Sequence, residues 1–390
     1  MQDNEKKPAL RFKGFTDPWE QRKVREVTDR YDNLRIPVAA SLRVAGTTPY
    51  YGANGIQDYV EGYTHDGEFI LVAEDGANDL KNYPVKCVKG RIWVNNHAHV
   101  LQGKCACADN QFLAYAISQA DIESLLVGGG RAKLNAETLM DIELLLPSKD
   151  EQIQIGHYLA RLDHLITLHQ RKYEKLVNIK KSMLDKMFPQ NGASVPEIRF
   201  KGFTDPWEQR KFGEVVDKYE DPVETPHDGY YRLGIRSHAK GTFHSYVEKG
   251  HELETAQMYR VAAGNFIVNI TFGWEHAVAI TNESDAGKLV SHRFPQYSFH
   301  DDMLPEFFKY VIADEDFRHW LWLASPGGAG RNRVLKLDEM LNYEMVLPSK
   351  EEQQRIAAIF RNLDTLITLH QRKLEKLQNI KKSCLEKMFV

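Results

Sequence analysis

Two long stretches of the chain carry residues at the seven-residue spacing of a coiled coil. In each stretch, two interleaved series of mostly apolar residues recur every seven positions. The first stretch has the series Ile155, Leu162, His169, Leu176 and Met183, and the series Leu159, Ile166, Tyr173, Lys180 and Met187. The second stretch has Ile356, Leu363, His370, Leu377 and Cys384, and Phe360, Ile367, Leu374, Lys381 and Met388. The pattern predicts two helices of about 40 residues, each with one apolar stripe that needs a partner.

The two stretches are copies of one another, and a shorter segment is also repeated. Residues 146–188 align to residues 347–389 without a gap, at an offset of 201, with 29 of 43 positions identical. Residues 11–23 return unchanged as residues 199–211, at an offset of 188. Because each helix can cover the apolar stripe of its own duplicate, we predict an antiparallel intramolecular coiled coil with an internal pseudo-twofold repeat. Such a pair would place the segments between the repeats at opposite ends.

The repeats divide the chain into constant and variable regions. The variable regions, residues 24–145 and 212–346, are 122 and 135 residues long and barely alike in sequence. The constant regions are an N-terminal segment (1–23), a central region with the first long helix, a linker and the second short repeat (146–211), and a distal helix (347–390). A copy of the short repeat follows the first helix but not the second. The N-terminal segment is therefore predicted to take the corresponding place beside the end of the second helix, which makes the constant frame circular.

Within the variable regions the pattern changes to short strands with few helices. Candidate strands lie at residues 69–73, 91–94 and 98–101 in the first region and at 265–270 and 277–280 in the second. One helix follows in each region, at residues 109–117 and 305–312, and both contain the skeleton Phe-x-x-Tyr-x-Ile. A glycine-rich basic loop at residues 128–133 or 327–333 then leads into a short helix and a last strand. The predicted fold class is α+β, with the variable regions as diverged copies of one fold.

The start of each long helix has the spacing of a capping box. Ser148 is followed three residues later by Glu151, and Ser349 by Glu352. In a capping box the serine hydroxyl and the glutamate carboxylate each accept a hydrogen bond from a backbone N–H of the first helical turn. We therefore predict that both glutamates bind the backbone at the helix start.

Composition restricts the class of protein further. The 51 Lys and Arg residues against 54 Asp and Glu give a formal net charge of −3, which excludes a uniformly basic nucleic-acid-binding surface but not a local one. Residues 161–187 and 361–388 each carry seven basic and three acidic residues, which is typical of a solvated helix face or of contact with DNA or an acidic partner. Four cysteines in a long chain indicate a reducing compartment. With no run of about 18 apolar residues, we expect a cytoplasmic protein and no membrane partner.

The sequence contains no complete catalytic signature. Gly287-Lys288 and Gly103-Lys104 lack the Ser or Thr that completes a Walker A motif, so ATP chemistry in this chain is not expected. The pair Asp-Pro-Trp at residues 17–19 and 205–207 only partly matches the box of amino methyltransferases and is interpreted as a turn with a packed Trp. His169 and His370 are interpreted as paired structural histidines. A zinc site could be assembled from Cys87, His97, His99, Cys105 and Cys107, but without Cys-x-x-Cys spacing these residues are better explained by packing or hydrogen bonding.

Three motifs together make the chain resemble the specificity subunit of type I restriction-modification systems over its whole length. They are the repeated Gly-Phe-Thr-Asp-Pro-Trp-Glu-Gln-Arg-Lys (14–23 and 202–211), the Leu-Pro-x-x-x-Glu-Gln entry to each long helix (146–152 and 347–353), and Thr-Pro-Tyr-Tyr-Gly-Ala-Asn-Gly (48–55). The resemblance implies that each variable region is a target recognition domain for one half of a split DNA sequence. It also implies that the paired helices set the spacer between the halves.

The resemblance further implies a non-catalytic subunit that binds no cofactor itself. Two methyltransferase subunits, which modify adenine at N6 with S-adenosylmethionine, would dock on it. Restriction/translocase subunits that use ATP and Mg would complete the assembly.

Polar side chains in glycine-rich segments or between strands are the candidates for contact with double-stranded DNA. Arg, Asn and Gln distinguish base edges in the major groove, and contacts to phosphates fix the register. For the first half-site the candidates are Tyr50, Tyr51, Asn54, Arg131 and Lys133; for the second they are Arg236, His238, Lys240, Arg331, Asn332 and Arg333.

Two other functions remain open at this point. The chain could be a non-catalytic scaffold whose two domains bind protein partners, or, less simply, a metalloenzyme. Salt-sensitive and sequence-dependent DNA binding would separate the DNA-binding function from the scaffold. Stoichiometric zinc would favour the metalloenzyme.

Overall fold

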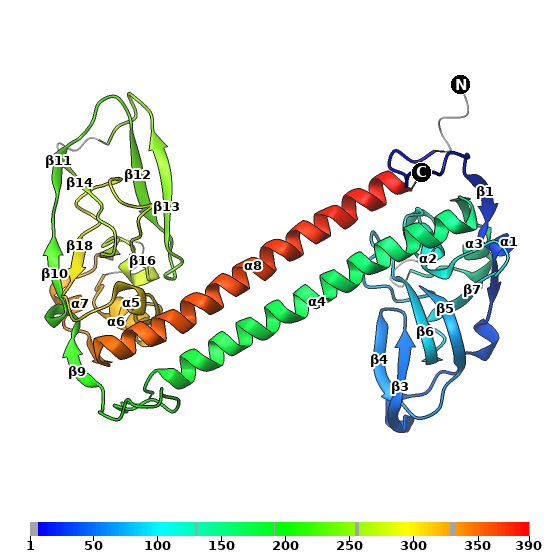
Figure 1. Cartoon of the computed structure of the whole chain (residues 1–390), viewed down its shortest axis with the longest axis horizontal. Helices are drawn as coiled ribbons and strands as arrows, with labels where there is room; N and C mark the ends of the chain where they lie inside the picture. The colour runs from blue at the N-terminus through cyan, green and yellow to red at the C-terminus, as the bar shows by residue number, and fades with distance from the viewer. Residues whose placement is uncertain (1–6, 129–131, 191, 254–256, 328–332, 390) are drawn as a thin grey trace. The chain divides into compact units, whose positions relative to one another are not determined.

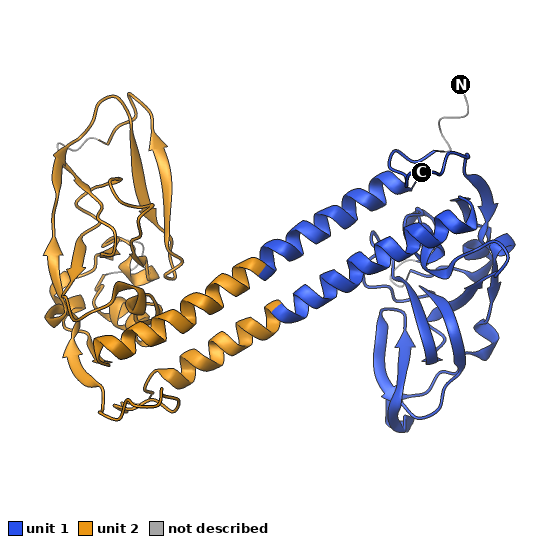
Figure 2. Ribbon diagram, in the orientation of Figure 1, with its two compact units in different colours: residues 1–172, 370–390 blue, residues 173–369 orange. Residues whose placement is uncertain are grey.

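The computed structural model describes residues 7–128, 132–190, 192–253, 257–327 and 333–389, and the chain forms two compact units (Figure 2). Unit 1 consists of residues 1–172 and 370–390, and unit 2 of residues 173–369. The long helices α4 (Lys149–Met187) and α8 (Lys350–Met388) have 39 residues each, and each contributes one part to either unit (Figure 1). The prediction of two helices of about 40 residues is confirmed.

Unit 1 is built on a six-stranded sheet formed by the first variable region. The strands, in spatial order, are β2 (Thr28–Arg30), β7 (Ala98–Gly103), β5 (His65–Ala73), β6 (Val85–Val94), β3 (Ala45–Gly52) and β4 (Gly55–Val60). Neighbours are antiparallel except β3 and β6, which run parallel. The predicted strands at 69–73, 91–94 and 98–101 lie in β5, β6 and β7, where runs of Val, Ile and Leu are buried in the sheet.

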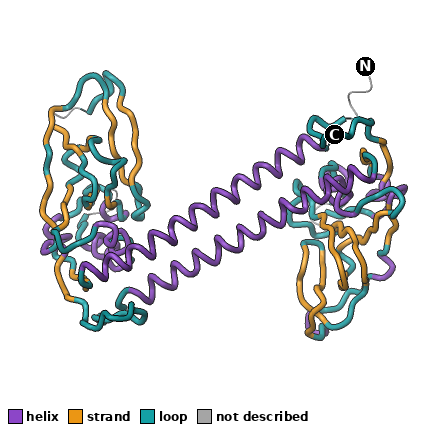
Figure 3. The backbone as a smooth tube through the Cα atoms, viewed as in Figure 1, coloured by secondary structure: helices purple, strands orange, loops and turns teal. Residues whose placement is uncertain are grey.

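Apart from its parts of α4 and α8, the helices and remaining strands of unit 1 are short (Figure 3). They are α1 (Val24–Val27), α2 (Asn110–Ser118) and α3 (Ala136–Asp141), with strand β1 (Glu20–Lys23) paired antiparallel to β8 (Glu143–Leu146). The predicted helix at 109–117 is α2, which the Asp109 carboxylate caps by accepting from the Phe112 N–H. The β1–β8 pair joins the short constant repeat to the end of the variable region.

In unit 2 the second variable region forms two sheets. One has the order β10 (Val216–Tyr219), β18 (Gln296–Phe299), β15 (Phe266–Val268) and β16 (Val278–Ile280). The other has the order β11 (Pro222–Glu224), β14 (Gln257–Arg260), β17 (Leu289–Val290), β12 (Tyr230–Ile235) and β13 (Thr242–Val247). The helices are α5 (Pro305–Val311), α6 (Glu315–Leu323) and α7 (Leu337–Leu341), and β9 (Glu208–Lys211) pairs with β19 (Glu344–Leu347).

The two variable regions share one strand topology. In unit 1, β3 forms a hairpin with β4 and lies parallel to β6; in unit 2, β12 forms a hairpin with β13 and lies parallel to β17. Likewise β2 pairs with β7 next to β5, as β10 pairs with β18 next to β15. The single sheet of unit 1 is therefore divided in unit 2. The hairpin turns also differ in length, because two residues join β3 to β4 and six join β12 to β13.

The constant segments form part of the hydrophobic core of each unit. In unit 1 the Trp19 ring lies 5.8 Å from Phe112 of α2 and 6.2 Å from Phe389, beyond the end of α8. Unit 2 repeats this arrangement, with Trp207 at 6.2 Å from Phe307 of α5 and 6.0 Å from Phe188, beyond the end of α4. Each indole of the repeated Asp-Pro-Trp is thus buried between the variable region and a long helix, as the interpretation of a packed Trp predicted.

The N-terminal segment takes the predicted place beside α8. The backbone N–H of Leu10 donates to the carbonyl oxygen of Lys387 at 2.8 Å in unit 1. In unit 2 the N–H of Ile198 donates to the carbonyl of Lys186, also at 2.8 Å. The donors Leu10 and Ile198 are 188 positions apart, which is the offset of the short repeat, and the acceptors Lys186 and Lys387 are 201 positions apart, which is the offset of the long repeat.

The capping-box prediction is wrong for both glutamates. In unit 1 the Glu151 carboxylate accepts two hydrogen bonds from the Arg11 guanidinium, at 2.6 and 2.7 Å. In unit 2 Glu352 accepts two from Arg199, both at 2.8 Å. Both carboxylates are fully buried, and a buried carboxylate is stabilised far more by a bidentate guanidinium than by one backbone N–H. The Glu of each helix entry therefore anchors the short constant repeat.

The following glutamine of each helix entry contacts the variable region. The Gln152 side-chain oxygen accepts from the Asp109 N–H at 3.0 Å, next to the start of α2. Its counterpart Gln353 accepts from the Leu304 N–H at 2.9 Å, next to the start of α5. Both glutamines are buried, so the repeated Glu-Gln pair holds two different segments at one point in each unit.

Within each unit the parts of α4 and α8 run antiparallel to each other. In unit 1, Asp163 forms an ion pair with Lys381 at 2.5 Å, and His169 Nδ1 lies 2.8 Å from His370 Nδ1. In unit 2, Lys180 forms an ion pair with Asp364 at 2.6 Å. All twenty residues of the predicted heptad series are buried or half-buried. The interpretation of His169 and His370 as a structural pair is confirmed.

Candidate nucleic-acid interface

The two tyrosines predicted to contact the first half-site lie inside unit 1. Tyr50 is only 1% exposed, and its hydroxyl contacts the backbone N–H and carbonyl of Val38 at 3.0 and 3.3 Å. The guanidinium of Arg43 covers the ring at 4.1 Å from its centroid. Tyr51 is also buried, and burial raises the pKa of its phenol. Neither side chain can meet a ligand without a rearrangement of the β3–β4 hairpin.

The other described candidates of unit 1 already have protein partners. The Asn54 amide donates to the carbonyl of Gly76 and accepts from the N–H of Asn78, both at 2.9 Å, so it fixes the loop after β5. Lys133 forms a 2.9 Å ion pair with Glu74, although its side chain is 46% exposed. Arg131 lies outside the described residues. The surface predicted for the first half-site is thus largely occupied by contacts within the unit.

A half-buried charged network, which the sequence analysis missed, lies beneath the end of the glycine-rich loop of unit 1. Glu74 also binds Arg35 at 2.7 Å, and Asp32 accepts from Nδ1 of His99 at 2.8 Å. Burial alone would raise the pKa of the Asp32 carboxyl, but the hydrogen bond from His99 and the charge of Arg35 hold it below its ordinary value. The pKa of Glu74 is lowered in the same way by Arg35 and Lys133. Arg35 and Glu74 lie 39 positions apart and Asp32 and His99 lie 67 positions apart, so no local motif reveals the network.

The residues once considered for zinc do not come together. His97 binds Asp75 at 2.5 Å, whereas His99 binds Asp32 and the carbonyl of Leu134. Cys105 and Cys107 are exposed, and Cys87 donates to Glu68. Across the described parts of the chain, no group of three or more His, Cys, Asp or Glu side chains is placed to hold a metal ion.

The candidates of unit 2 that lie in the β12–β13 turn are exposed. Arg236, His238 and Lys240 all face solvent in this six-residue turn. The backbone N–H of His238 donates to the carbonyl of Glu275 at 2.9 Å, which holds the turn against the rest of the unit. Of the second glycine-rich loop, Arg331 and Asn332 lie outside the described residues. Arg333 stacks on Trp322, at 4.9 Å from the ring.

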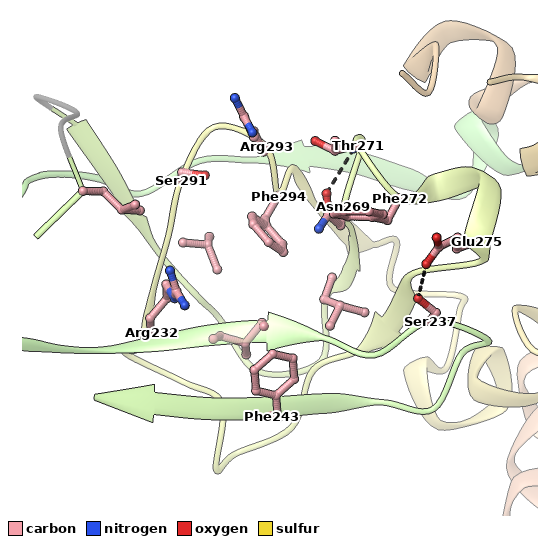
Figure 4. A pocket seen from close by; sticks show the side chains of 15 residues that line it. Arg232, Ser237, Phe243, Asn269, Thr271, Phe272, Glu275, Ser291, Arg293 and Phe294 are labelled. Carbon is pink, nitrogen blue, oxygen red and sulfur yellow. Dashed lines mark hydrogen bonds between the residues drawn. The ribbon is translucent and has the colours of Figure 1, made fainter. Parts of the chain in front are cut away.

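An open cleft of about 450 Å³ lies beside this turn (Figure 4). Its walls come from β12 and β13, from the segment after β15, and from the loop after β17. The lining residues with polar or aromatic side chains are Arg232, Ser237, Phe243, Asn269, Thr271, Phe272, Glu275, Ser291, Arg293 and Phe294. Of these segments, the sequence pattern marks the turn, which contributes Ser237, as a candidate contact, and it marks residues 265–270, which contain Asn269, only as a strand, because isolated Arg and Asn residues between short strands form no motif.

The comparison with known proteins bears on what this interface is for. A family model described as type I restriction modification DNA specificity domain matches residues 16–178 and 205–379. The chain belongs to this family. Each match to the specificity domain spans one variable region and most of the long helix that follows it. The duplicated frame therefore corresponds to two specificity domains in one chain.

Curated relatives of the family are named as specificity subunits. A putative type I restriction enzyme specificity subunit of Haemophilus influenzae is 42% identical over 173 residues, 40% of this chain. That match spans 45% of the relative's own length. The type I restriction enzyme MjaVIII specificity subunit of Methanocaldococcus jannaschii is 23% identical over 299 residues, 72% of this chain and 70% of the relative.

A solved structure shares the fold of this specificity-domain chain. The S subunit of a type I restriction-modification system from M. genitalium superposes with a TM-score of 0.65 at 14% identity, and the match covers 98% of this chain and 99% of that one. Over the described residues, no helix combines the length and the apolar character needed to cross a bilayer.

Proposed function

We propose that the chain is the DNA-specificity subunit of a type I restriction-modification complex in the cytoplasm, with each unit binding one half of a bipartite target. One observation carries the proposal: two variable regions with the same strand topology but different sequences are each held by the same constant frame. The frame holds both regions through corresponding residues, such as Trp19 and Trp207 or Gln152 and Gln353. A duplicated frame with different surfaces suits a protein that recognises two different sequences. The membership of the specificity-domain family supports the same function.

The physical basis is additive discrimination between base pairs. A side chain that makes two hydrogen bonds to a base edge contributes about 1–3 kcal/mol of discrimination against the wrong base. When two half-sites must be occupied at a fixed separation, these contributions combine. We propose that α4 and α8 form one antiparallel coiled coil that fixes this separation. The ion pairs of Asp163 and Asp364 with lysines of the opposite helix support this role.

The chain is proposed to act with partners rather than as an enzyme. Two methyltransferase subunits would bring S-adenosylmethionine and adenine-N6 methylation, and restriction/translocase subunits would bring ATP and Mg. The excess basic charge of each helix offers a surface for acidic partners or for DNA phosphates. Double-stranded DNA is the ligand of the two variable regions in this proposal.

The test is a genome-wide map of N6-methyladenine in a methylation-free bacterial host that expresses the chain with a type I modification subunit. We expect one new split motif, methylated on both strands and absent without the chain. A specificity subunit with a known target serves as the positive control. If the complex forms and the control works but no motif appears, the chain is not a DNA-specificity subunit, and a protein-binding scaffold becomes the better explanation.

A further inference from the structure

The open cleft of unit 2 carries positive charge that no described residue neutralises. Arg232 extends from β12 and Arg293 from the loop after β17, and both are among the residues that line the cleft (Figure 4). Within the described residues, neither guanidinium has a hydrogen-bond or ion-pair partner. By contrast, Arg199, Arg210, Arg260 and Arg318 of the same unit are each paired with a carboxylate.

Among the described lining residues, the one acidic side chain does not balance these arginines. The Glu275 carboxylate accepts a 2.7 Å hydrogen bond from the hydroxyl of Ser237. It lies on the side of the cleft formed by the β12–β13 turn, away from Arg232 and Arg293 (Figure 4). The cleft therefore keeps two unpaired positive groups that favour an electron-rich ligand.

The loops that carry the cleft are fixed before any ligand binds. The carbonyl of Arg293 accepts from the N–H of Ile270 at 3.0 Å, which ties the loop after β17 to the segment after β15. Asn269 accepts through its side-chain oxygen from the N–H of Thr271 at 3.0 Å, and its NH₂ group has no partner among the described residues. A preorganised site loses less conformational entropy when it binds.

Two exposed aromatic rings line the same cleft. Phe243 is 40% exposed and Phe272 39%, and the guanidinium of Arg236 lies 5.3 Å from the Phe243 ring. The Phe243 ring lies against Gly234 so closely that a Cβ there would be 2.3 Å from it. Only glycine at position 234 leaves the ring in this place. A cleft that holds exposed rings as well as free guanidinium groups suits base edges and thymine methyl groups better than phosphate alone.

From these contacts we infer that the cleft is where unit 2 reads its half-site, with Arg232 and Arg293 each recognising a guanine through its O6 and N7 atoms. The inference rests on the proposed function and names residues that determine its specificity. An arginine free of carboxylate partners can donate two parallel hydrogen bonds to these acceptors from its rigid planar fork, whereas a lysine reaches the same atoms without that fixed geometry.

The test compares alanine and lysine variants of both arginines in the complex with its modification subunit. Arg293→Ala, Arg293→Lys, Arg232→Ala and Arg232→Lys are mapped by their methylated motif. They are also assayed for binding to duplexes in which each base pair of the target is replaced in turn. Arg318→Ala, which breaks an exposed ion pair of the same unit, is the matched control. Thermal unfolding of each complex shows whether it is folded.

We expect each arginine variant to lose discrimination at one G·C position by about 5- to 150-fold, while the other half-site stays unchanged. The unchanged half-site shows that the complex is assembled and folded. The lysine variants should lose part of this discrimination and the alanine variants all of it, and Arg318→Ala should keep the original motif.

The inference is overturned if folded variants keep the original preference at every position. It is also overturned if affinity falls equally for all duplexes and lysine restores it, because that result identifies a phosphate contact. If the unaltered chain itself yields no motif, the proposed function fails first. The two failures are therefore distinguishable.

Discussion

The replacement Arg199→Met should destabilise unit 2 because it leaves the buried Glu352 carboxylate without its partner. The Glu352 side chain is 1% exposed, the Arg199 side chain 13%, and two hydrogen bonds of 2.8 Å join them. Breaking a buried pair by removing one partner costs about 3–5 kcal/mol. The double variant Arg199→Met with Glu352→Met removes both charges and should recover most of this loss, since an apolar pair of similar volume is often neutral.

Native-state hydrogen exchange can measure this effect in each unit separately. Peptides from β15 should show a free energy of opening lowered by about 3–5 kcal/mol in Arg199→Met, and peptides from β5 of unit 1 should not change. Arg11→Met should lower the free energy of opening for peptides from β5 and leave peptides from β15 unchanged, because Arg11 binds Glu151 in the same way. The control Arg318→Met breaks an exposed pair and should cost under about 1 kcal/mol. A cost for Arg199→Met as small as that control, or a double variant no better than the single one, would refute the reasoning.

Two further predictions concern pH. His99 and Arg35 hold the pKa of Asp32 below 3.8, so the Asp32 carboxylate stabilises unit 1 above that pH, and this stabilisation is lost as the pH falls through the lower pKa of the folded state. Asp32→Asn should therefore lower the urea midpoint at pH 6 and make the midpoint decline less steeply below pH 4. An equally steep decline in the variant and the original chain would argue against the network. Burial, His370 and nearby lysines lower the pKa of His169, so folding favours the neutral ring and the stability of the chain should fall as the pH drops below 6.5. The double variant His169→Leu with His370→Leu should remove this pH dependence in urea denaturation followed by circular dichroism. An unchanged pH dependence in the double variant would assign it to other groups.

The frame was predictable from sequence because its signals are periodic or repeated. The heptad series placed α4 and α8, and the offsets of the repeats placed the N-terminal segment beside Lys387. The glutamate half of the capping box failed because the Ser-x-x-Glu spacing is local, whereas the actual partner of Glu151 lies 140 residues away in sequence; at the second helix the Ser349 hydroxyl does accept from the Glu352 N–H. Only the folded chain brings that guanidinium to the start of the helix.

The candidate site was less predictable, because exposure depends on distant segments. Tyr50 and Tyr51 stand beside a glycine-rich turn, yet Tyr50 is stacked with Trp93 and bonded to Val38, and Tyr51 packs into a hydrophobic cluster with Phe69. Arg236, His238 and Lys240 are exposed in the turn as its polar sequence suggests. Arg232 and Arg293 lie 61 positions apart, and only the packing of β12 near the loop after β17 brings them to one cleft. No spacing rule connects such residues.

The skeleton Phe-x-x-Tyr, shared by two otherwise unlike regions, has a physical consequence for how such chains change. Tyr115 of α2 donates to Asp163 of α4 at 2.6 Å, and Tyr310 of α5 donates to Asp364 of α8 at 3.0 Å. Each variable region thus meets the frame through the same tyrosine–aspartate bond, in addition to the ring packing of Trp19 and Trp207 and the hydrogen bonds of Gln152 and Gln353. A variable region that keeps these contacts is therefore expected to fit either copy of the frame as an interchangeable module, while the rest of its surface is left to vary.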